Sequence, residues 1–141
     1  MANDPVLHLL GLAKKAGRLE IGEEPVGAVC RAGHARLVVV AGDASDHCVR
    51  RVQSFVSGTN QPWLTVSCTK EELGAAIGRS ACAMAVFTDV RLALAFVQAL
   101  EEGECPAGLL EDLEVRAKRA EQRQREEKAH QRNLRRGGRK K

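Results

Sequence analysis

Apolar residues in the first 102 positions alternate between helical spacing and short segments of strand-like pattern. Helical spacing follows five candidate start residues, namely Asp4, Gly22, Ser45, Thr69 and Asp89. Runs typical of strands occupy residues 19–21, 37–41, 63–67 and 83–88. This alternation predicts an α/β fold, specifically a three-layer α/β/α sandwich around a central sheet of about four strands that are mostly parallel.

Local signals support the positions of these elements. Thr69 is followed by Glu72 at the spacing of a capping box, while Ser45 and Asp89 have side chains that cap helices well. The run from 37 to 41 contains no polar residue, as expected of a central strand covered on both faces. We therefore expect helices on both sides of the sheet.

The pattern changes after the domain that we assign to residues 1–102. Residues 103–108 are expected to form a hinge. Residues 109–136 predict a basic helical extension, and residues 137–141 a disordered basic tail. The apolar stripe of the extension is made by Leu109, Leu113, Ala117 and Ala120. Because this stripe ends after about three turns, we expect the first part of the helix to dock on the domain and the rest to project into solvent.

Charge is divided unevenly along the chain. Residues 1–108 contain 10 Lys/Arg and 12 Asp/Glu, a net charge of −2, whereas residues 109–141 contain 12 Lys/Arg and 6 Asp/Glu, a net charge of +6. A basic tail on an acidic body indicates a polyanionic partner, most often nucleic acid. The candidate phosphate contacts are Arg116, Arg119, Arg123, Arg132, Arg135 and Arg136. The alternative is a solvated helix whose interleaved charges serve solubility.

Residue types that carry catalysis are present, but their pattern does not converge. The richest segment contains Asp43, Ser45, Asp46, His47 and Cys48. Neighbours at a helix start point in different directions, so they cannot meet as the members of a catalytic triad do. A helix cap beside an exposed histidine is the simpler interpretation. We expect a non-enzymatic protein that needs no cofactor.

The cysteines indicate a reducing compartment. Cys30, Cys48, Cys68, Cys82 and Cys105 are odd in number, and no two stand at metal-ligand spacing. Small buried or half-buried thiols are therefore expected rather than a zinc site or a disulfide framework. The start of the chain lacks the pattern of a signal peptide, and no run approaches the ~20 apolar residues of a membrane span. These features predict a cytoplasmic protein with no membrane partner.

Five segments carry a resemblance to a known family. They are residues 9–19 (LLGLAKKAGRL), 22–24 (GEE), 37–45 (LVVVAGDAS), 69–74 (TKEELG) and 77–81 (IGRSA). Together they resemble the bacterial YlxQ-type proteins of the ribosomal-protein superfamily of kink-turn RNA binders. The resemblance covers roughly residues 5–100 in order and implies an RNA partner, structured and possibly ribosomal.

The resemblance also implies which residues contact RNA. The start of the second helix would contribute Gly22, Glu23 and Glu24, and the loop before the last strand Arg79, Ser80, Ala81 and Cys82. Free N–H groups at a helix start suit phosphates, and a loop of small residues lets the backbone approach unstacked bases. A carboxylate at the helix start is suited to the N1–H and N2–H donors of guanine.

The chain departs from the family pattern at two positions. Where relatives usually carry a Glu or Gln and then a lysine one turn later, this chain has Pro25 and Ala28. Arg31, Arg36, Arg79, Lys14 and Lys15 are the candidates for replacing the missing charge. Together with the acidic body, these departures keep an alternative open: a protein–protein interaction module that has lost RNA binding and pairs through its helical tail.

Overall fold

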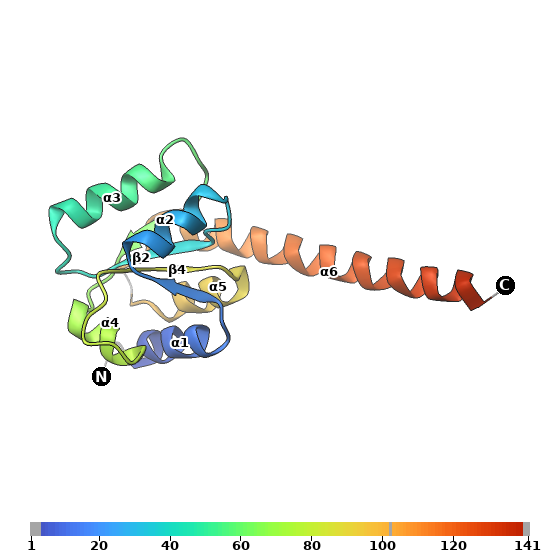
Figure 1. Cartoon of the computed structure of the whole chain (residues 1–141), viewed down its shortest axis with the longest axis horizontal. Helices are drawn as coiled ribbons and strands as arrows, with labels where there is room; N and C mark the ends of the chain where they lie inside the picture. The colour runs from blue at the N-terminus through green and yellow to red at the C-terminus, as the bar shows by residue number, and fades with distance from the viewer. Residues whose placement is uncertain (1–3, 102, 140–141) are drawn as a thin grey trace.

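The computed structural model describes residues 4–101 and 103–139, which form six helices and four strands (Figure 1). In chain order they are α1 (Asp4–Lys15), β1 (Leu19–Ile21), α2 (Glu23–Arg31), β2 (Leu37–Val40), α3 (Asp46–Val56), β3 (Trp63–Thr65), α4 (Lys70–Ala76), β4 (Met84–Phe87), α5 (Val90–Ala99) and α6 (Leu109–Arg139). The predicted order of elements is confirmed, with strands shorter than the apolar runs at several ends.

β4 lies inside the sheet and runs against its neighbours. The strand order is β1-β4-β2-β3, with β2 and β3 parallel and β4 antiparallel to both β1 and β2. Phe87 of β4 pairs with Leu19 on one side and with Leu37 on the other. It follows that β1, β2 and β3 all run in one direction and that β4 alone is reversed.

The expectation of a mostly parallel sheet is wrong, because two of the three strand pairings are antiparallel. The alternation of helical and strand segments predicts parallel strands, and the apolar run at 37–41 predicts a strand covered on both faces. Every residue of β2 and of β4 is indeed buried. That burial arises from helices on both faces of the sheet, and it is the same whichever way a strand runs. The three-layer α/β/α sandwich is confirmed.

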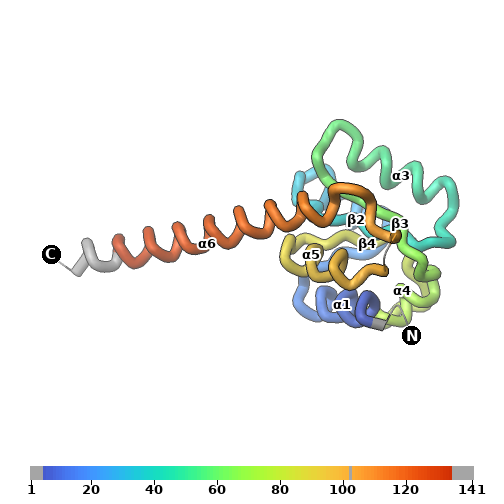
Figure 2. The backbone as a smooth tube through the Cα atoms, turned by 180° about the vertical axis from the view of Figure 1, so that it is seen from behind, coloured from blue at the N-terminus to red at the C-terminus, as the bar shows by residue number. Residues whose placement is uncertain are grey.

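Two apolar cores lie on opposite faces of the sheet. Leu37 and Val39 belong to the core beneath α1, α4 and α5, whereas Val38 and Val40 belong to the core beneath α2 and α3. Successive side chains of a strand point to opposite faces, so one short run supplies both cores. Figures 1 and 2 show these helices as two layers on either side of the strands.

The expected caps are present at three helices. The Ser45 hydroxyl accepts from the Cys48 N–H at the start of α3. Thr69 and Glu72 form the reciprocal capping box of α4, with N–H to oxygen distances of 3.1 and 3.0 Å. These side chains satisfy donors that the first turn of a helix leaves unpaired. Asp89 does the same for α5.

The first turns of α6 dock on the body through the apolar stripe. Leu109, Leu113 and Ala117 are buried, and the helix packs against α5. The guanidinium of Arg116 extends this contact by donating to the backbone oxygen of Asn60 at 2.7 Å. The docking that the stripe indicated is therefore observed.

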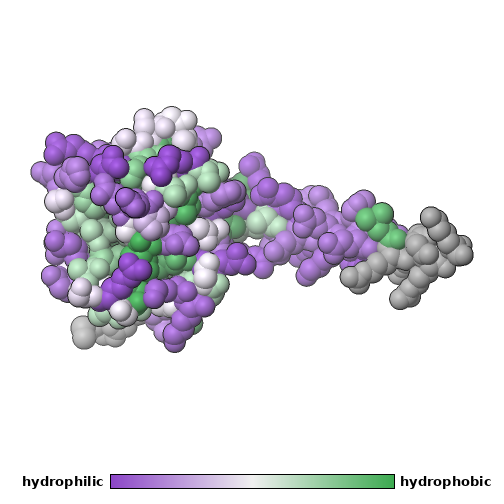
Figure 3. Space-filling view, viewed as in Figure 1, coloured by the Kyte–Doolittle hydropathy of each residue, from purple (hydrophilic) through white to green (hydrophobic). Residues whose placement is uncertain are grey.

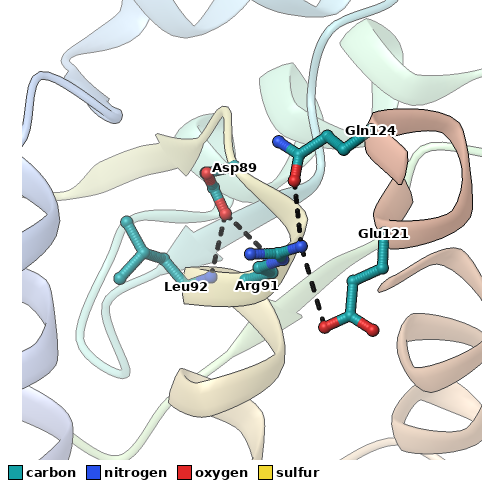
Figure 4. A network of polar contacts seen from close by, with 5 residues as sticks. All are labelled: Asp89, Arg91, Leu92, Glu121 and Gln124. Carbon is teal, nitrogen blue, oxygen red and sulfur yellow. Dashed lines mark hydrogen bonds and ion pairs between the residues drawn. The ribbon is translucent and has the colours of Figure 1, made fainter. Parts of the chain in front are cut away.

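Arg91 in the first turn of α5 provides a polar contact to α6 (Figure 4). Asp89 accepts from the N–H groups of Arg91 and Leu92 at 2.8 and 3.2 Å, which fixes the start of α5. The Arg91 guanidinium then donates to the side chain of Gln124 at 3.1 Å and lies 3.7 Å from Glu121. Beyond the Gln124 contact, α6 projects from the body (Figure 2).

α6 is longer than expected. It ends at Arg139 rather than at residue 136, so Gly137 and Gly138 are helical where we expected disorder. A glycine costs a helix only about 1 kcal/mol relative to alanine, and that preference does not by itself end an established helix. Lys140 and Lys141, the last residues of the expected tail, lie outside the described residues.

Gly74 lets the loop between α4 and β4 lie directly on α4. A Cβ atom at this position would lie 2.7 Å from the backbone N and Cα of Ala81 and 2.8 Å from the backbone oxygen of Arg79. Backbone atoms cannot move aside as a flexible side chain does. The small residue at 74 therefore sets the position of residues 79–81.

We expect Gly74→Ala to lower the free energy of unfolding by about 1–3 kcal/mol, because the added methyl group overpacks a backbone contact. Urea denaturation followed by circular dichroism measures this change. Ala75→Ser, at an exposed position of the same helix, is the control, because surface substitutions usually change stability by less than about 0.5 kcal/mol. A loss for Gly74→Ala no larger than that of the control would contradict the assigned contact.

Docking of α6 should depend on Leu113, which is fully buried against the body. We expect Leu113→Ala to cost about 2–5 kcal/mol of unfolding free energy, as other large-to-small core substitutions do. Val115→Ala is the matched control, because Val115 lies on the same helix and is 47% exposed. Equal midpoints of thermal unfolding for the two variants would argue against a docked α6.

Candidate nucleic-acid interface

A cleft of about 230 Å³ lies where β1 ends and β4 begins. One wall is the start of α2, with Gly22 and Glu23, and the other is the loop between α4 and β4, with Arg79, Ala81 and Cys82. We call it the α2–loop cleft; its remaining lining residues are Ile21, His47, Cys48, Ala83 and Met84. Two segments more than 50 residues apart in the chain therefore meet at one site.

Backbone geometry shapes the α2 wall of this cleft. Gly22 precedes the helix with φ 100° and ψ 162°, a conformation essentially restricted to glycine. Its N–H donates to the backbone oxygen of Met84 at 3.2 Å, which ties the helix start to β4. Within the described part of the chain no side chain caps α2. The N–H groups of Glu23 and Glu24 therefore lack an intrahelical partner and remain available to a ligand.

The opposite wall is held in place by backbone hydrogen bonds. Arg79 follows a Schellman turn, in which its N–H donates to the oxygen of Gly74 at 2.8 Å while Gly78 adopts a φ of 76°. Further along the loop, the Cys82 N–H donates to the oxygen of Lys70 at 2.9 Å. The loop is thus fixed at both ends to α4, and the exposed Arg79 side chain starts from a defined position.

The cysteines at the cleft are neutral thiols. Burial raises the pKa of Cys82 to about 11, and the pKa of Cys48 is also raised by burial and by the nearby Glu23 carboxylate. Cys82 is 3% exposed and directs its thiol to the backbone oxygen of Met84 at 3.4 Å. All five cysteines are free, and four are buried, as the sequence indicated. A protonated thiol is a poor nucleophile, so these residues give the cleft an uncharged wall.

A second groove of about 670 Å³ lies beside the cleft, between α2 and α3. We call it the α2–α3 groove; its lining residues are Glu23, Glu24, Pro25, Ala28, Arg31, Arg51 and Phe55. The Arg51 guanidinium lies over the Phe55 ring, 4.9 Å from its centroid, and pairs with the Glu23 carboxylate. Glu23 borders both hollows. Its negative charge is partly balanced by Arg51 of α3.

The structure separates the predicted contact residues into three groups. Gly22, Glu23, Arg79, Ala81 and Cys82 line the cleft, with Ser80 exposed in the same loop. Glu24 and Arg31 line the adjacent groove. The arginines predicted in the C-terminal helix form the third group, which lies on α6.

The six α6 arginines have different surroundings. Arg116 is engaged with the body, since it pairs with Asp112 at 3.0 Å and bonds to Asn60. Arg119 and Arg123 are exposed and border a shallow hollow on the helix. Arg132 is exposed on the projecting part. Positions 135 and 136 belong to α6, but their side chains lie outside the described ones.

Sequence reasoning missed two residues at these hollows. His47 lines the cleft and Arg51 lines the groove, both from α3. His47, Arg51 and Phe55 recur every fourth residue, a spacing that places them on one ridge of the helix. That spacing is visible in the sequence, but the position of this ridge beside the start of α2 is not.

Within residues 4–101 and 103–139, no group of three or more His, Cys, Asp or Glu side chains is arranged to hold a metal ion. None of the helices described there combines the length and apolar character needed to cross a membrane.

Comparisons with known proteins point to one family. The family model for the ribosomal protein L7Ae/L30e/S12e/Gadd45 family matches residues 4–93. A Bacillus halodurans protein of unknown function is 28% identical with a TM-score of 0.62, over 67% of this chain and 94% of that chain. The Giardia lamblia 15.5kD RNA binding protein is 19% identical with a TM-score of 0.57, over 79% of this chain and 89% of that chain. No curated protein matches the chain by sequence.

The matched residues 4–93 extend from the start of α1 into α5, so they contain both walls of the α2–loop cleft and exclude α6. The Giardia protein shares the fold of the body. The superfamily that the sequence resembles is confirmed by this match over more than half of the chain. The chain therefore belongs to the ribosomal protein L7Ae/L30e/S12e/Gadd45 family.

Proposed function

We propose that this protein binds structured RNA without catalysing a reaction, and that it holds a sharply bent segment in the α2–loop cleft. The observation that carries the proposal is the meeting of the α2 start with the α4–β4 loop around one cleft. Support comes from the ribosomal proteins in the family's description and from the Giardia protein of the same fold, which is described as RNA binding.

The cleft offers complementary groups to RNA. Free N–H groups at Glu23 and Glu24 and the guanidinium of Arg79 suit phosphate oxygens, which are the dominant contacts in nucleic-acid binding. The Glu23 carboxylate accepts hydrogen bonds and suits the Watson–Crick edge of an unpaired guanine. Ala81 and the neutral thiol of Cys82 leave room for the flat face of a base. An unstacked nucleotide at a sharp bend exposes its phosphate, the Watson–Crick edge of its base and the flat face of that base at one place.

The α2–α3 groove places positive charge beside Pro25 and Ala28, the two positions at which the chain departs from the family pattern. Pro25 and Ala28 contribute no charged group, yet Arg31 and Arg51 line the same groove. Two cations beside the cleft offset the acidic residues at the helix start and suit the phosphates that flank a bend. This arrangement favours RNA over the alternative of an interaction module that has lost RNA binding.

The class of RNA follows from the family. We infer a ribosomal RNA or a ribosome-assembly intermediate containing a kink-turn, and a role like that of the bacterial YlxQ-type proteins. The identity of 28% to a Bacillus halodurans protein supports a bacterial origin. Five free cysteines fit a reducing compartment such as the cytoplasm. Neutral thiols at the cleft favour binding rather than catalysis, because they offer no activated nucleophile.

The first test concerns Arg79. We expect Arg79→Gln to weaken binding of a kink-turn RNA roughly 5- to 150-fold, because the loss of one good polar contact to nucleic acid costs about 1–3 kcal/mol. Fluorescence anisotropy with the full chain measures the dissociation constant. Arg50→Gln is the control, since Arg50 is an exposed α3 residue outside the lining residues of the cleft and the groove. Equal effects of the two substitutions would remove Arg79 from the site.

The second test separates shape recognition by the body from attraction by charge. We expect Glu23→Ala to weaken binding of a kink-turn RNA more than binding of a straight duplex with the same number of phosphates. The reason is that a carboxylate contributes to base recognition but repels phosphates. Binding of both RNAs is measured at two salt concentrations. An equal or tighter affinity of the variant for the kink-turn RNA would exclude Glu23 as a base contact. No binding of either RNA by the unmodified chain would favour the interaction module.

A further inference from the structure

The projecting part of α6 carries its positive charge on one face. Arg125, Lys128 and Arg132 are spaced by three and four residues, which places them one above another on a helix. Positions 135, 136 and 139 are also basic in the sequence and continue the same register. At 3.6 residues per turn, these six positions fall within an arc of about 100°. We call this arc the basic face.

The acidic residues between 125 and 139 lie off the basic face, and Glu121, one turn below Arg125, lies 3.7 Å from the Arg91 guanidinium. Glu126 and Glu127 are the two acidic residues between 125 and 139, and their positions fall outside the arc. Leu134, which is 62% exposed, falls opposite the arc. Every residue from 121 to 134 is exposed, and Figure 3 shows this part of α6 covered mainly by hydrophilic residues. The interleaved acids therefore do not neutralise the basic face.

The basic face and the α2–loop cleft lie at opposite ends of the molecule. The cleft includes Ile21 and Met84, where β1 ends and β4 begins. α6 leaves the body beside Asn60 and Arg91, which precede β3 and follow β4 respectively. These two points mark the other end of the sheet, because β4 runs against β3 and β1. Figures 1 and 2 show α6 projecting away from α4 and from the start of α3.

The distance between the α2–loop cleft and the basic face is large compared with the length of a bent nucleotide segment. A four-residue strand spans ~13 Å, and the 15 residues from 125 to 139 add ~22 Å of helix beyond the body. A single unstacked nucleotide held in the cleft does not also reach the basic face. The two surfaces therefore act on different segments.

The composition of α6 indicates the kind of segment that suits it. Residues 109–141 contain no Phe, Trp or Tyr. Single-stranded RNA is usually held by aromatic side chains on which its bases stack, and the basic face offers none. Double-stranded RNA presents its phosphates without requiring stacking, and it is recognised mainly through backbone and shape. A straight, exposed row of cations therefore suits a duplex.

We propose that the basic face of α6 is a second RNA site, which holds a double-stranded segment apart from the bent segment in the α2–loop cleft. One protein chain then bridges two RNA segments at opposite ends of its body. The inference rests on the proposed function for the cleft, but it assigns α6 a separate ligand.

A capture experiment tests this bridge. A short kink-turn RNA is immobilised on beads and saturated with the full-length protein, and a fluorescent straight RNA duplex is then added. We expect the protein to retain the duplex on the beads while the kink-turn RNA stays bound. Displacement of the protein from the kink-turn RNA by the duplex would show a single shared site and would overturn the inference.

The control variant rearranges charge without changing composition. The substitutions Arg125→Glu, Glu126→Arg, Glu127→Lys and Lys128→Glu keep the net charge and move two cations off the basic face. We expect this variant to capture the duplex at least about tenfold more weakly and with a shallower salt dependence, because it makes fewer phosphate contacts. Circular dichroism confirms that the helix content is retained. Undiminished capture would mean that net charge suffices, which contradicts a defined face.

The outcomes for the two sites are distinguishable. If the unmodified chain binds the kink-turn RNA but does not capture the duplex, the inference about α6 fails and the proposed function of the cleft stands. If the chain binds the duplex but not the kink-turn RNA, the proposed function fails, and with it the bridge.

Discussion

β4 pairs through its backbone with β1 on one side and with β2 on the other. This pairing fixes the position of the α2–loop cleft relative to the base of α6. Met84, at the start of the strand, borders the α2–loop cleft. Phe87, at its end, pairs with both Leu19 and Leu37 and leads through Asp89 to the α5 turn that contacts α6. Ladder hydrogen bonds on both edges make a strand the least mobile part of a sheet protein. The cleft and the base of the projecting helix are thus joined through one buried strand.

Most of the elements could be predicted from the sequence because their signals are local. The capping box at Thr69 and the apolar run at 37–40 depend on residues that are close in the chain. Strand direction depends on pairings between distant segments, and an apolar run reads the same in either direction. This is why the reversed β4 was not foreseen. The end of α6 differs for another reason. Disorder is predicted from residue 137 onward, but the weak helix preference of Gly137 and Gly138 does not end an established helix, which continues to Arg139.

The candidate site was predictable only in part. Resemblance to a family indicated the α2 start and the α4–β4 loop, and the structure brings these segments to one cleft. The contribution of α3 was not predicted. The ridge that carries His47 and Arg51 borders the site because α3 packs beside α2, and this packing cannot be read from the sequence. Arg51 also changes how the acidic helix start is understood. In the sequence Glu23 stands as an isolated negative charge, whereas in the structure it pairs with Arg51. The start of α2 is therefore a surface of mixed charge.

The contact between α6 and the body has a mechanical consequence. Buried Leu113 and Ala117 hold the helix mainly by apolar packing, while the exposed ion pair of Arg91 with Glu121 adds little. Apolar packing is insensitive to the ionic strengths at which phosphate contacts dissociate. The docked turns of α6 therefore stay in place at those ionic strengths. They give the projecting part of the helix a fixed starting direction, and the entropy of ordering this base is lost during folding rather than at the moment of binding.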